Sequence, residues 1–302
     1  MNINLQNQNQ QPKTKTLEIP YNFDKQLIDF LYMLDDTGSV YHSIYCCPHK
    51  DDYISAKYYH HASYGLDMLK ANDMTKQEYI SHIQNIEKKF PKKLMLLLQQ
   101  NDYCMPLDKL SFYLALGFTK FCVGSLEQAK QIKEINSDYE VIGSITMKVS
   151  IAQLNDPEYQ KYFDGFVLWF PYNRNFEILP SLPKCFEYTM LVNCDCNIKC
   201  DGTHHWFANR TTEKAKPEGF CPNSAYKGGP QDWNYSIRIR PVDLPAFMPY
   251  ITHFKLQGRE HLTRAIMMDV CTYLGNYDQY PGLQPDPSWY MASNRKKKTE
   301  NG

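Results

Sequence analysis

The chain has 302 residues, of which 43% are hydrophobic and 14% aromatic, enough for one large core or two small ones. Its 33 Lys and Arg residues balance its 33 Asp and Glu residues, which argues against a dedicated nucleic-acid binder, because such proteins are usually basic. Its 10 cysteines occur without a signal peptide and without an apolar run long enough to span a membrane. We therefore predict a cytoplasmic protein whose cysteines serve as thiols or ligands.

Both ends of the sequence are predicted to lie outside the folded domain. Residues 1–16 are rich in Asn and Gln and have no apolar period, which is typical of a flexible leader. Residues 277–302 contain the basic run Arg295–Lys298 and are predicted to form an extended tail. A single domain is expected over residues 17–276.

Between these ends, short apolar runs alternate with stretches of helical spacing. Helices are expected at Tyr53–Leu69, Thr75–Phe90, Pro106–Leu116, from Ser125 onward, and at Arg259–Leu274. Gly117 and Gly275 are suited to end two of these helices. Strands are expected at Val40–Cys46, Lys93–Leu98, Thr119–Val123, Glu140–Thr146, Gly165–Phe170, Phe186–Val192, Tyr235–Ile239 and Thr252–Leu256.

Eight strands that alternate with helices predict an α/β protein, a (β/α)8 TIM-type barrel of about 250 residues. A doubly wound open sheet is the alternative, but no Gly-x-Gly-x-x-Gly turn follows any expected strand. In such barrels the active site lies at the carboxyl ends of the strands. We expect that rim to carry His42, Gln99, Lys148, Arg174 and Arg240.

A cysteine-rich insertion directly follows the sixth expected strand. It contains Cys194, Cys196, Cys200 and Cys221, with His204 and His205 between the last two cysteines. Thiolates bind both iron–sulfur clusters and zinc, so we predict a metal site in this insertion. Unpaired thiols in a surface loop are the alternative interpretation.

Several segments resemble landmarks of the collagenase-like peptidase family U32. Residues Phe254–Arg259 read Phe-Lys-Leu-Gln-Gly-Arg and resemble the family signature Phe-Lys-Ile-Glu-Gly-Arg, with Gln257 in place of the usual glutamate. The segment Asn193–Cys200 resembles the cysteine segment of one uncharacterised branch, although its spacing differs from that of the better-known hydroxylation proteins. Further similar motifs, in the expected order, are Asn22–Asp24, Asn173–Phe176 and Arg240–Asp243.

The resemblance implies a barrel with a cysteine-bound iron–sulfur cluster. Several family members are associated with oxygen-independent hydroxylation of tRNA, rRNA or the ubiquinone ring, and others carry a collagenase-type protease label. We expect Cys196, Cys200 and Cys221 to ligate a four-iron cluster, with zinc as the alternative metal. Cys194 is the nearest fourth ligand, and His204 is its alternative.

The leading functional hypothesis is a redox enzyme that modifies an RNA base, a small ring or a peptide, supplied by an electron donor or a partner subunit. Arg174, Arg240 and Arg259 would anchor the substrate through their forked donors, with ordinary salt bridges as the alternative. A peptidase ranks second, because the sequence has no Gly-x-Ser-x-Gly elbow and no His-Glu-x-x-His helix. A zinc-stapled binding protein without catalysis ranks third.

Overall fold

Eight parallel strands close into a barrel in the computed structural model, which describes residues 15–49, 51–52, 74–99, 104–194, 238–258, 262–276 and 279–283. Each strand pairs with the next one along the chain, and the last pairs with the first. The strands are β1 Thr16–Pro20, β2 Tyr41–Cys46, β3 Leu94–Leu98, β4 Lys120–Val123, β5 Glu140–Gly143, β6 Gly165–Val167, β7 Glu187–Leu191 and β8 His253–Lys255.

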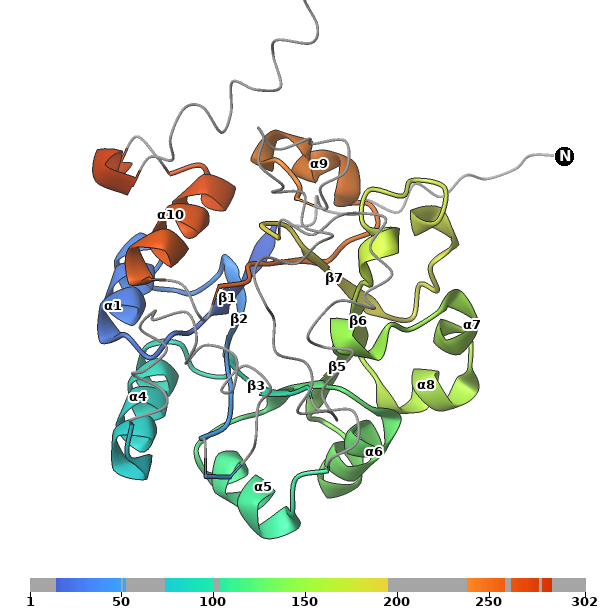
Figure 1. Cartoon of the computed structure of the whole chain (residues 1–302), viewed down its shortest axis with the longest axis horizontal. Helices are drawn as coiled ribbons and strands as arrows, with labels where there is room; N and C mark the ends of the chain where they lie inside the picture. The colour runs from blue at the N-terminus through green and yellow to red at the C-terminus, as the bar shows by residue number, and fades with distance from the viewer. Residues whose placement is uncertain are drawn as a thin grey trace, which may run out of the picture.

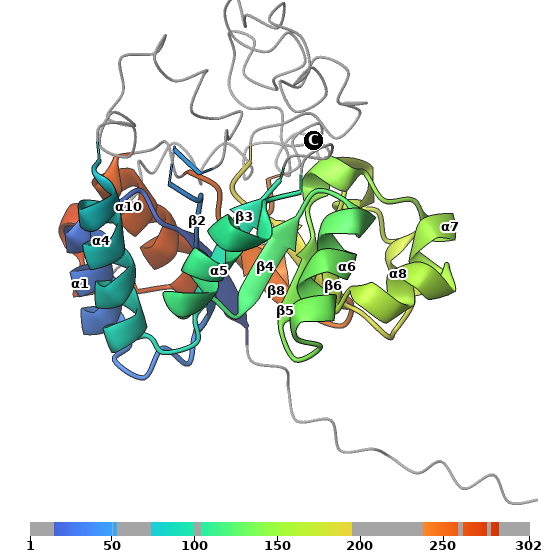
Figure 2. The ribbon, with the colours of Figure 1, turned by 90° about the horizontal axis from the view of Figure 1, so that it is seen from below.

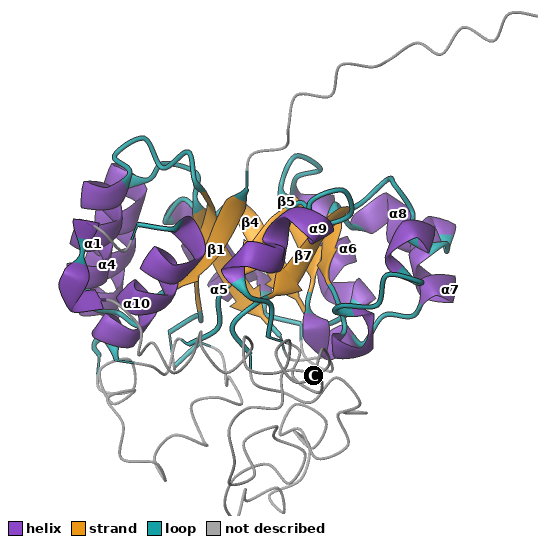
Figure 3. Ribbon diagram, turned by 90° about the horizontal axis from the view of Figure 1, so that it is seen from above, coloured by secondary structure: helices purple, strands orange, loops and turns teal. Residues whose placement is uncertain are grey.

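Helices surround the barrel, as the view down its axis shows (Figure 1), and the side view separates the inner strands from the outer helices (Figure 3). The described helices are α1 Lys25–Leu34, α4 Lys76–Lys89, α5 Leu107–Ala115, α6 Leu126–Ile135, α7 Ile151–Leu154, α8 Pro157–Tyr162, α9 Leu244–Phe247 and α10 Thr263–Leu274. The strands all run in one direction (Figure 2). Their carboxyl ends therefore share one end of the barrel, here called the mouth, and their amino ends share the other, here called the base.

Alternation along each strand divides the apolar residues into two cores, because successive side chains point to opposite faces of a sheet. The larger core lies between the strands and the helices and includes Ile44, Leu96 and Phe121. The smaller core fills the barrel on the mouth side, where Tyr45, Met95, Leu97, Cys122 and Ile142 pack together. This apolar filling is typical of TIM-type barrels.

Polar side chains occupy the barrel on the base side. Strands β4, β5, β7 and β8 begin with Lys120, Glu140, Glu187 and His253, respectively. By the period of two, Lys120 shares a face with Cys122, and Glu140 shares one with Ile142, so both point into the barrel. Glu140 bonds Lys120 at 2.5 Å and the Nε2 atom of His42 at 2.8 Å. The interior is therefore apolar near the mouth and ionic near the base.

The predicted (β/α)8 barrel is confirmed, but two of its strands differ from the expectation. The barrel strand β1 begins at Thr16, at the end of the segment predicted as a leader. The prediction of a seventh strand at Tyr235–Ile239 is wrong for Arg238 and Ile239, which lie outside the barrel sheet; residues 235–237 lie outside the described part. The cysteine-rich insertion consequently follows β7 instead of a sixth strand.

The expected helices are recovered where the chain is described. A capping box between Thr75 and Glu78 begins α4, because each residue satisfies a backbone N–H that the helix leaves free. Gly275 ends α10 in the left-handed conformation, with φ 81°. The expected helix at Tyr53–Leu69 lies outside the described residues. Among the residues described, every helix is too short or too polar to serve as a membrane span.

Candidate functional site at the mouth of the barrel

Asn193 connects the ends of the last two strands at the mouth. Its Oδ1 atom accepts a hydrogen bond from the backbone N–H of Gln257 at 2.8 Å, and its Nδ2 atom donates to the carbonyl of Gln257 at 2.9 Å. The same Nδ2 atom donates to Asp269 of α10 at 2.8 Å. Asn193 is only 2% exposed, so these bonds satisfy an amide that would be costly to bury alone.

The described residues on either side of residues 195–237 contact each other at the mouth. The Nη2 atom of Arg238 donates to the carbonyl of Asn193 at 3.1 Å, and the N–H of Ile239 donates to the carbonyl of Val192 at 2.9 Å. The hydroxyl of Tyr273 lies 2.7 Å from the carbonyl of Val192 and 2.9 Å from that of Ile239. The insertion at residues 195–237 therefore starts and ends at the mouth.

Cys194 is the one predicted cysteine ligand that the structure describes. It is 3% exposed and belongs to the apolar core inside the barrel, together with Phe170 and Leu191. Trp169 packs against this core, and its ring lies 5.0 Å from that of Phe170. Cys194 thus has the surroundings of a packing residue.

A cation lies over an aromatic ring at the mouth. The Nζ atom of Lys148 is 5.0 Å from the centre of the Trp169 ring, a cation–π distance. Lys148 has φ 50° and ψ 43°, a left-handed conformation that non-glycine residues adopt at some cost. The backbone conformation of Lys148, in the turn after β5, thus helps to place a positive charge beside the indole of Trp169.

Two of the three predicted substrate-anchoring arginines lie near Asp243. Arg240 forms a forked ion pair with Asp243, at 2.6 Å through Nε and 2.8 Å through Nη2. The charge of Asp243 also acts on Arg174, raising the pKa of the guanidinium, whereas burial lowers it and has the larger effect. Arg240 therefore forms the kind of ion pair that the sequence analysis gave as the alternative to substrate anchoring.

Two of the motifs similar to the U32 family follow strands and lie at the mouth, although they are far apart in the sequence. The motif at Asn22–Asp24 follows β1 and ties it to α10, because Thr263 donates to Asp24 at 2.6 Å and accepts from Asn22 at 3.0 Å. The motif at Asn173–Phe176 follows β6, and the Nδ2 atom of Asn173 donates to the carbonyl of Leu191 at 3.0 Å. These motif residues thus position the strand ends that form the mouth.

Five predicted site residues lie outside the described residues: Cys196, Cys200, Cys221, His204 and Arg259. The expectation that His42 belongs to the rim is wrong. His42 is the second residue of β2 and lies at the base, where its ring stacks on that of His253. A residue at the start of a strand lies at the base, whereas a residue that follows the strand lies at the mouth.

Sequence reasoning missed the ionic cluster at the base. The available signal was the charged or imidazole residue at the first position of β4, β5, β7 and β8, two residues before an inward-facing position. Such a pattern can be found only once the strand boundaries are known.

No protein-family model and no curated protein matches the sequence. Among solved structures, the chain is similar to one described as the U32 peptidase Mk0906. The two share 13% sequence identity with a TM-score of 0.39, over 61% of this chain and 76% of the other. The fold defines this chain as a (β/α)8-barrel protein.

Proposed function

We propose that this chain is a distant U32-type barrel enzyme that carries out a redox modification, such as oxygen-independent hydroxylation, at the mouth of its barrel. Its substrate would be a small ring, an RNA base or a peptide. The carrying observation is that both ends of the cysteine-rich insertion are held at the mouth, through Asn193 and Arg238. The insertion thus starts and ends where barrel enzymes hold their substrates.

The donor set suits a thiolate-bound metal group. Cys196, Cys200 and Cys221 are the proposed ligands of an iron–sulfur cluster, because soft thiolates are its usual protein ligands. Cys194 packs in the apolar core, which favours His204 over Cys194 as the fourth ligand. A bound cluster would supply electron transfer to the reaction.

The described part of the mouth has groups that would hold a flat or anionic substrate. Trp169 offers an indole face and Lys148 a positive charge beside it. Arg174, half-buried at the end of the segment after β6, offers a forked donor. We keep Arg174 and Arg259 as proposed substrate-anchoring residues. Arg240 forms an ion pair with Asp243, and we propose that it positions the segment that follows the insertion.

Purification without oxygen tests this proposal. The visible absorbance and the iron, sulfide and zinc content should be compared between the wild type and a Cys196→Ala/Cys200→Ala variant. A Cys104→Ala/Cys185→Ala variant is the matched control, because both of these thiols are exposed and lie outside the insertion. We expect the wild type and the control to contain equal amounts of iron and sulfide and to show a broad visible absorbance. The Cys196→Ala/Cys200→Ala variant should lose the iron, the sulfide and the absorbance.

Two other outcomes would contradict the proposal. Zinc at one equivalent, lost in the same variant, would favour a zinc-stapled binding protein. A folded wild type without metal would contradict both the iron–sulfur and the zinc assignment. Peptide cleavage that survives chelation and fails after cysteine alkylation would then support the peptidase alternative.

A further inference from the structure

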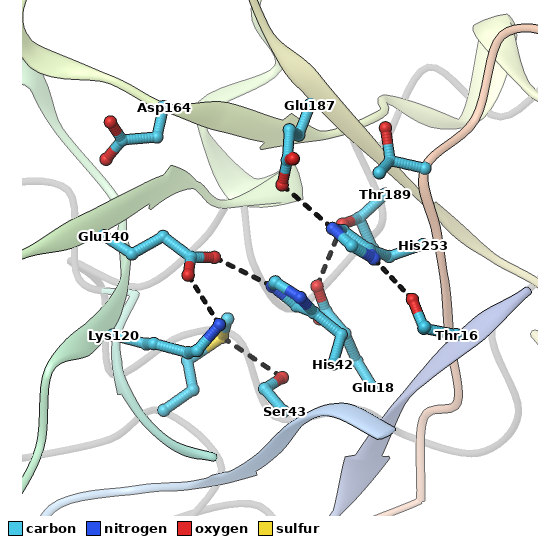
Figure 4. Close-up of polar contacts among 12 residues, drawn as sticks. Thr16, Glu18, His42, Ser43, Lys120, Glu140, Asp164, Glu187, Thr189 and His253 are labelled. Carbon is cyan, nitrogen blue, oxygen red and sulfur yellow. Dashed lines mark hydrogen bonds and ion pairs between the residues drawn. The ribbon is translucent and has the colours of Figure 1, made fainter. Parts of the chain in front are cut away.

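Three potential metal ligands meet at the base of the barrel, at the opposite end from the cysteine-rich insertion. They are His42 near the start of β2, Glu187 at the start of β7 and His253 at the start of β8 (Figure 4). One ligand atom from each lies within 4.8 Å of the others. Because all three are held by barrel strands, their backbones are fixed by the sheet pairing around them.

A local irregularity in the barrel turns His42 toward this cluster. Leu17 of β1 pairs with Tyr41, but the next residue, Glu18, pairs with Ser43, so His42 is an extra residue in β2. Such a bulge changes the direction of one side chain without ending the strand. His42 consequently lies inside the barrel, where its ring is 3.5 Å from that of His253.

The charges of the base leave one carboxylate without a permanent cation. Glu140 is matched by Lys120, and Glu18 by Lys255. In the described part of the chain, the one ion-pair partner of Glu187 is His253, at 3.0 Å, and that residue is charged only when protonated.

The hydrogen bonds around His253 suit metal binding through its Nε2 atom. Its Nδ1 atom lies 2.6 Å from the hydroxyl of Thr16, and its Nε2 atom faces Glu187. A histidine ligand usually donates its second N–H to an oxygen in this way, which fixes the ring. A metal ion would lie between Nε2 and the carboxylate in place of any proton there, because a histidine binds a metal through a deprotonated nitrogen.

We propose that His42, His253 and Glu187 form a binding site for a zinc-type divalent cation at the base of the barrel. Two imidazoles and one carboxylate are a donor set that zinc binds in proteins, with further positions open to water. Glu187 has a side chain that is 53% exposed, so the site is reachable from solvent. Binding requires the two stacked rings to turn apart, because a metal lies in the plane of each imidazole that it binds.

The test uses the Cys196→Ala/Cys200→Ala variant as the reference chain, because it lacks two of the three thiolates proposed as ligands in the insertion. Metal-free reference chain is titrated calorimetrically with Zn²⁺, and with Co²⁺ while its visible absorbance is recorded. Glu187→Gln and His253→Gln are made in the same background. Glu127→Gln is the matched control, because Glu127 is an exposed carboxylate on α6, away from the cluster.

The reference chain should bind one equivalent of Zn²⁺ without a cobalt–thiolate band. Thr16→Val should weaken Zn²⁺ binding about 10-fold, because it removes the hydroxyl that holds the His253 ring. Glu187→Gln should weaken it by more than about 100-fold, because it removes a proposed ligand. Glu127→Gln should bind like the reference. Failure of the reference chain to bind Zn²⁺, or unchanged binding by Glu187→Gln, would overturn the proposal. Glu187 is exposed and Gln has nearly the same shape as Glu, so Glu187→Gln should fold. It therefore tests the proposed metal site even if His253→Gln does not fold. The outcome is independent of the iron–sulfur assignment.

Discussion

Glu18 on the first strand and Lys255 on the last form a buried ion pair inside the barrel, although they are 237 residues apart in the sequence. Glu18 is fully buried and Lys255 is 5% exposed. The hydroxyl of Thr189 donates to the second oxygen of Glu18 at 2.9 Å, and the ammonium of Lys255 lies 3.8 Å from the centre of the Tyr45 ring. The pair therefore lies across the seam where the barrel closes, with a hydroxyl on the second carboxylate oxygen and an aromatic ring beside the ammonium.

We predict that Lys255→Met destabilises the protein by about 3–5 kcal/mol, because it leaves Glu18 as an uncompensated buried charge. The measurement is the free energy of unfolding in denaturant. Lys88→Met, at an exposed position of α4, is the control and should change that free energy by less than about 0.5 kcal/mol. A Glu18→Met/Lys255→Met double replacement should recover part of the loss, because it removes both charges. Equal effects of Lys255→Met and Lys88→Met would rule out a structural role for the pair.

The same pair predicts an acid dependence of stability. Burial raises the pKa of Glu18, but the charge and hydrogen bond of Lys255 outweigh it, so the net pKa is below the ordinary value of 4.5. A depressed carboxyl pKa contributes stability that is fully present above the unfolded-state value and is lost as pH falls through the folded-state value. Unfolding free energies measured on both sides of pH 4.5 should fall more steeply in the wild type than in Glu18→Gln. Parallel curves would contradict this assignment.

Asn193→Ala should loosen the mouth without unfolding the barrel. The substitution leaves the backbone N–H and carbonyl of Gln257 without their partner, at a cost of about 1–3 kcal/mol. Hydrogen exchange at the amide of Gln257 should therefore accelerate. Asn155→Ala is the control, because Asn155 is exposed and bonds only within its own turn. Unchanged exchange at Gln257 would show that the amide is held by something other than Asn193.

Gly275→Ala should destabilise the protein through backbone conformation alone. Gly275 has φ 81°, and a Cβ atom added there would meet nothing within 4 Å. The left-handed conformation costs an alanine about 1–2 kcal/mol. Gly282→Ala is a matched control, because its added Cβ atom also meets nothing within 4 Å. Thermal unfolding should distinguish the two variants, and equal midpoints would contradict the conformational explanation.

The barrel could be predicted from sequence because seven of its strands are apolar runs bounded by turns or helices, as at Leu94–Leu98. The strand Thr16–Pro20 was missed for a physical reason. Its inward position carries Glu18, whose ion-pair partner Lys255 lies 237 residues away in the sequence. The segment that ends at Ile239 was wrongly predicted as a barrel strand. Ile239 bonds to Val192, in the short stretch after β7, and not to a barrel strand.

The candidate site was predictable only in part. Arg174 and the Asn193 segment follow strands, so the barrel rule places them at the mouth. The ion pair of Arg240 with Asp243 is local, at i and i+3, and could have been found from spacing. The meeting of His42 with His253 could not, because it depends on a bulge in β2 and on the closure of β1 against β8.

The contact between Arg238 and Asn193 also has an evolutionary consequence. Hydrogen bonds join the residues just before residues 195–237 to the residues just after them. The length of the stretch between them therefore does not affect the order of the strands. Lengthening such a connection has only a slow, logarithmic entropic cost. Residues 195–237 are therefore inserted at a position where a lineage can change the length and sequence of the connection while the barrel is inherited unchanged.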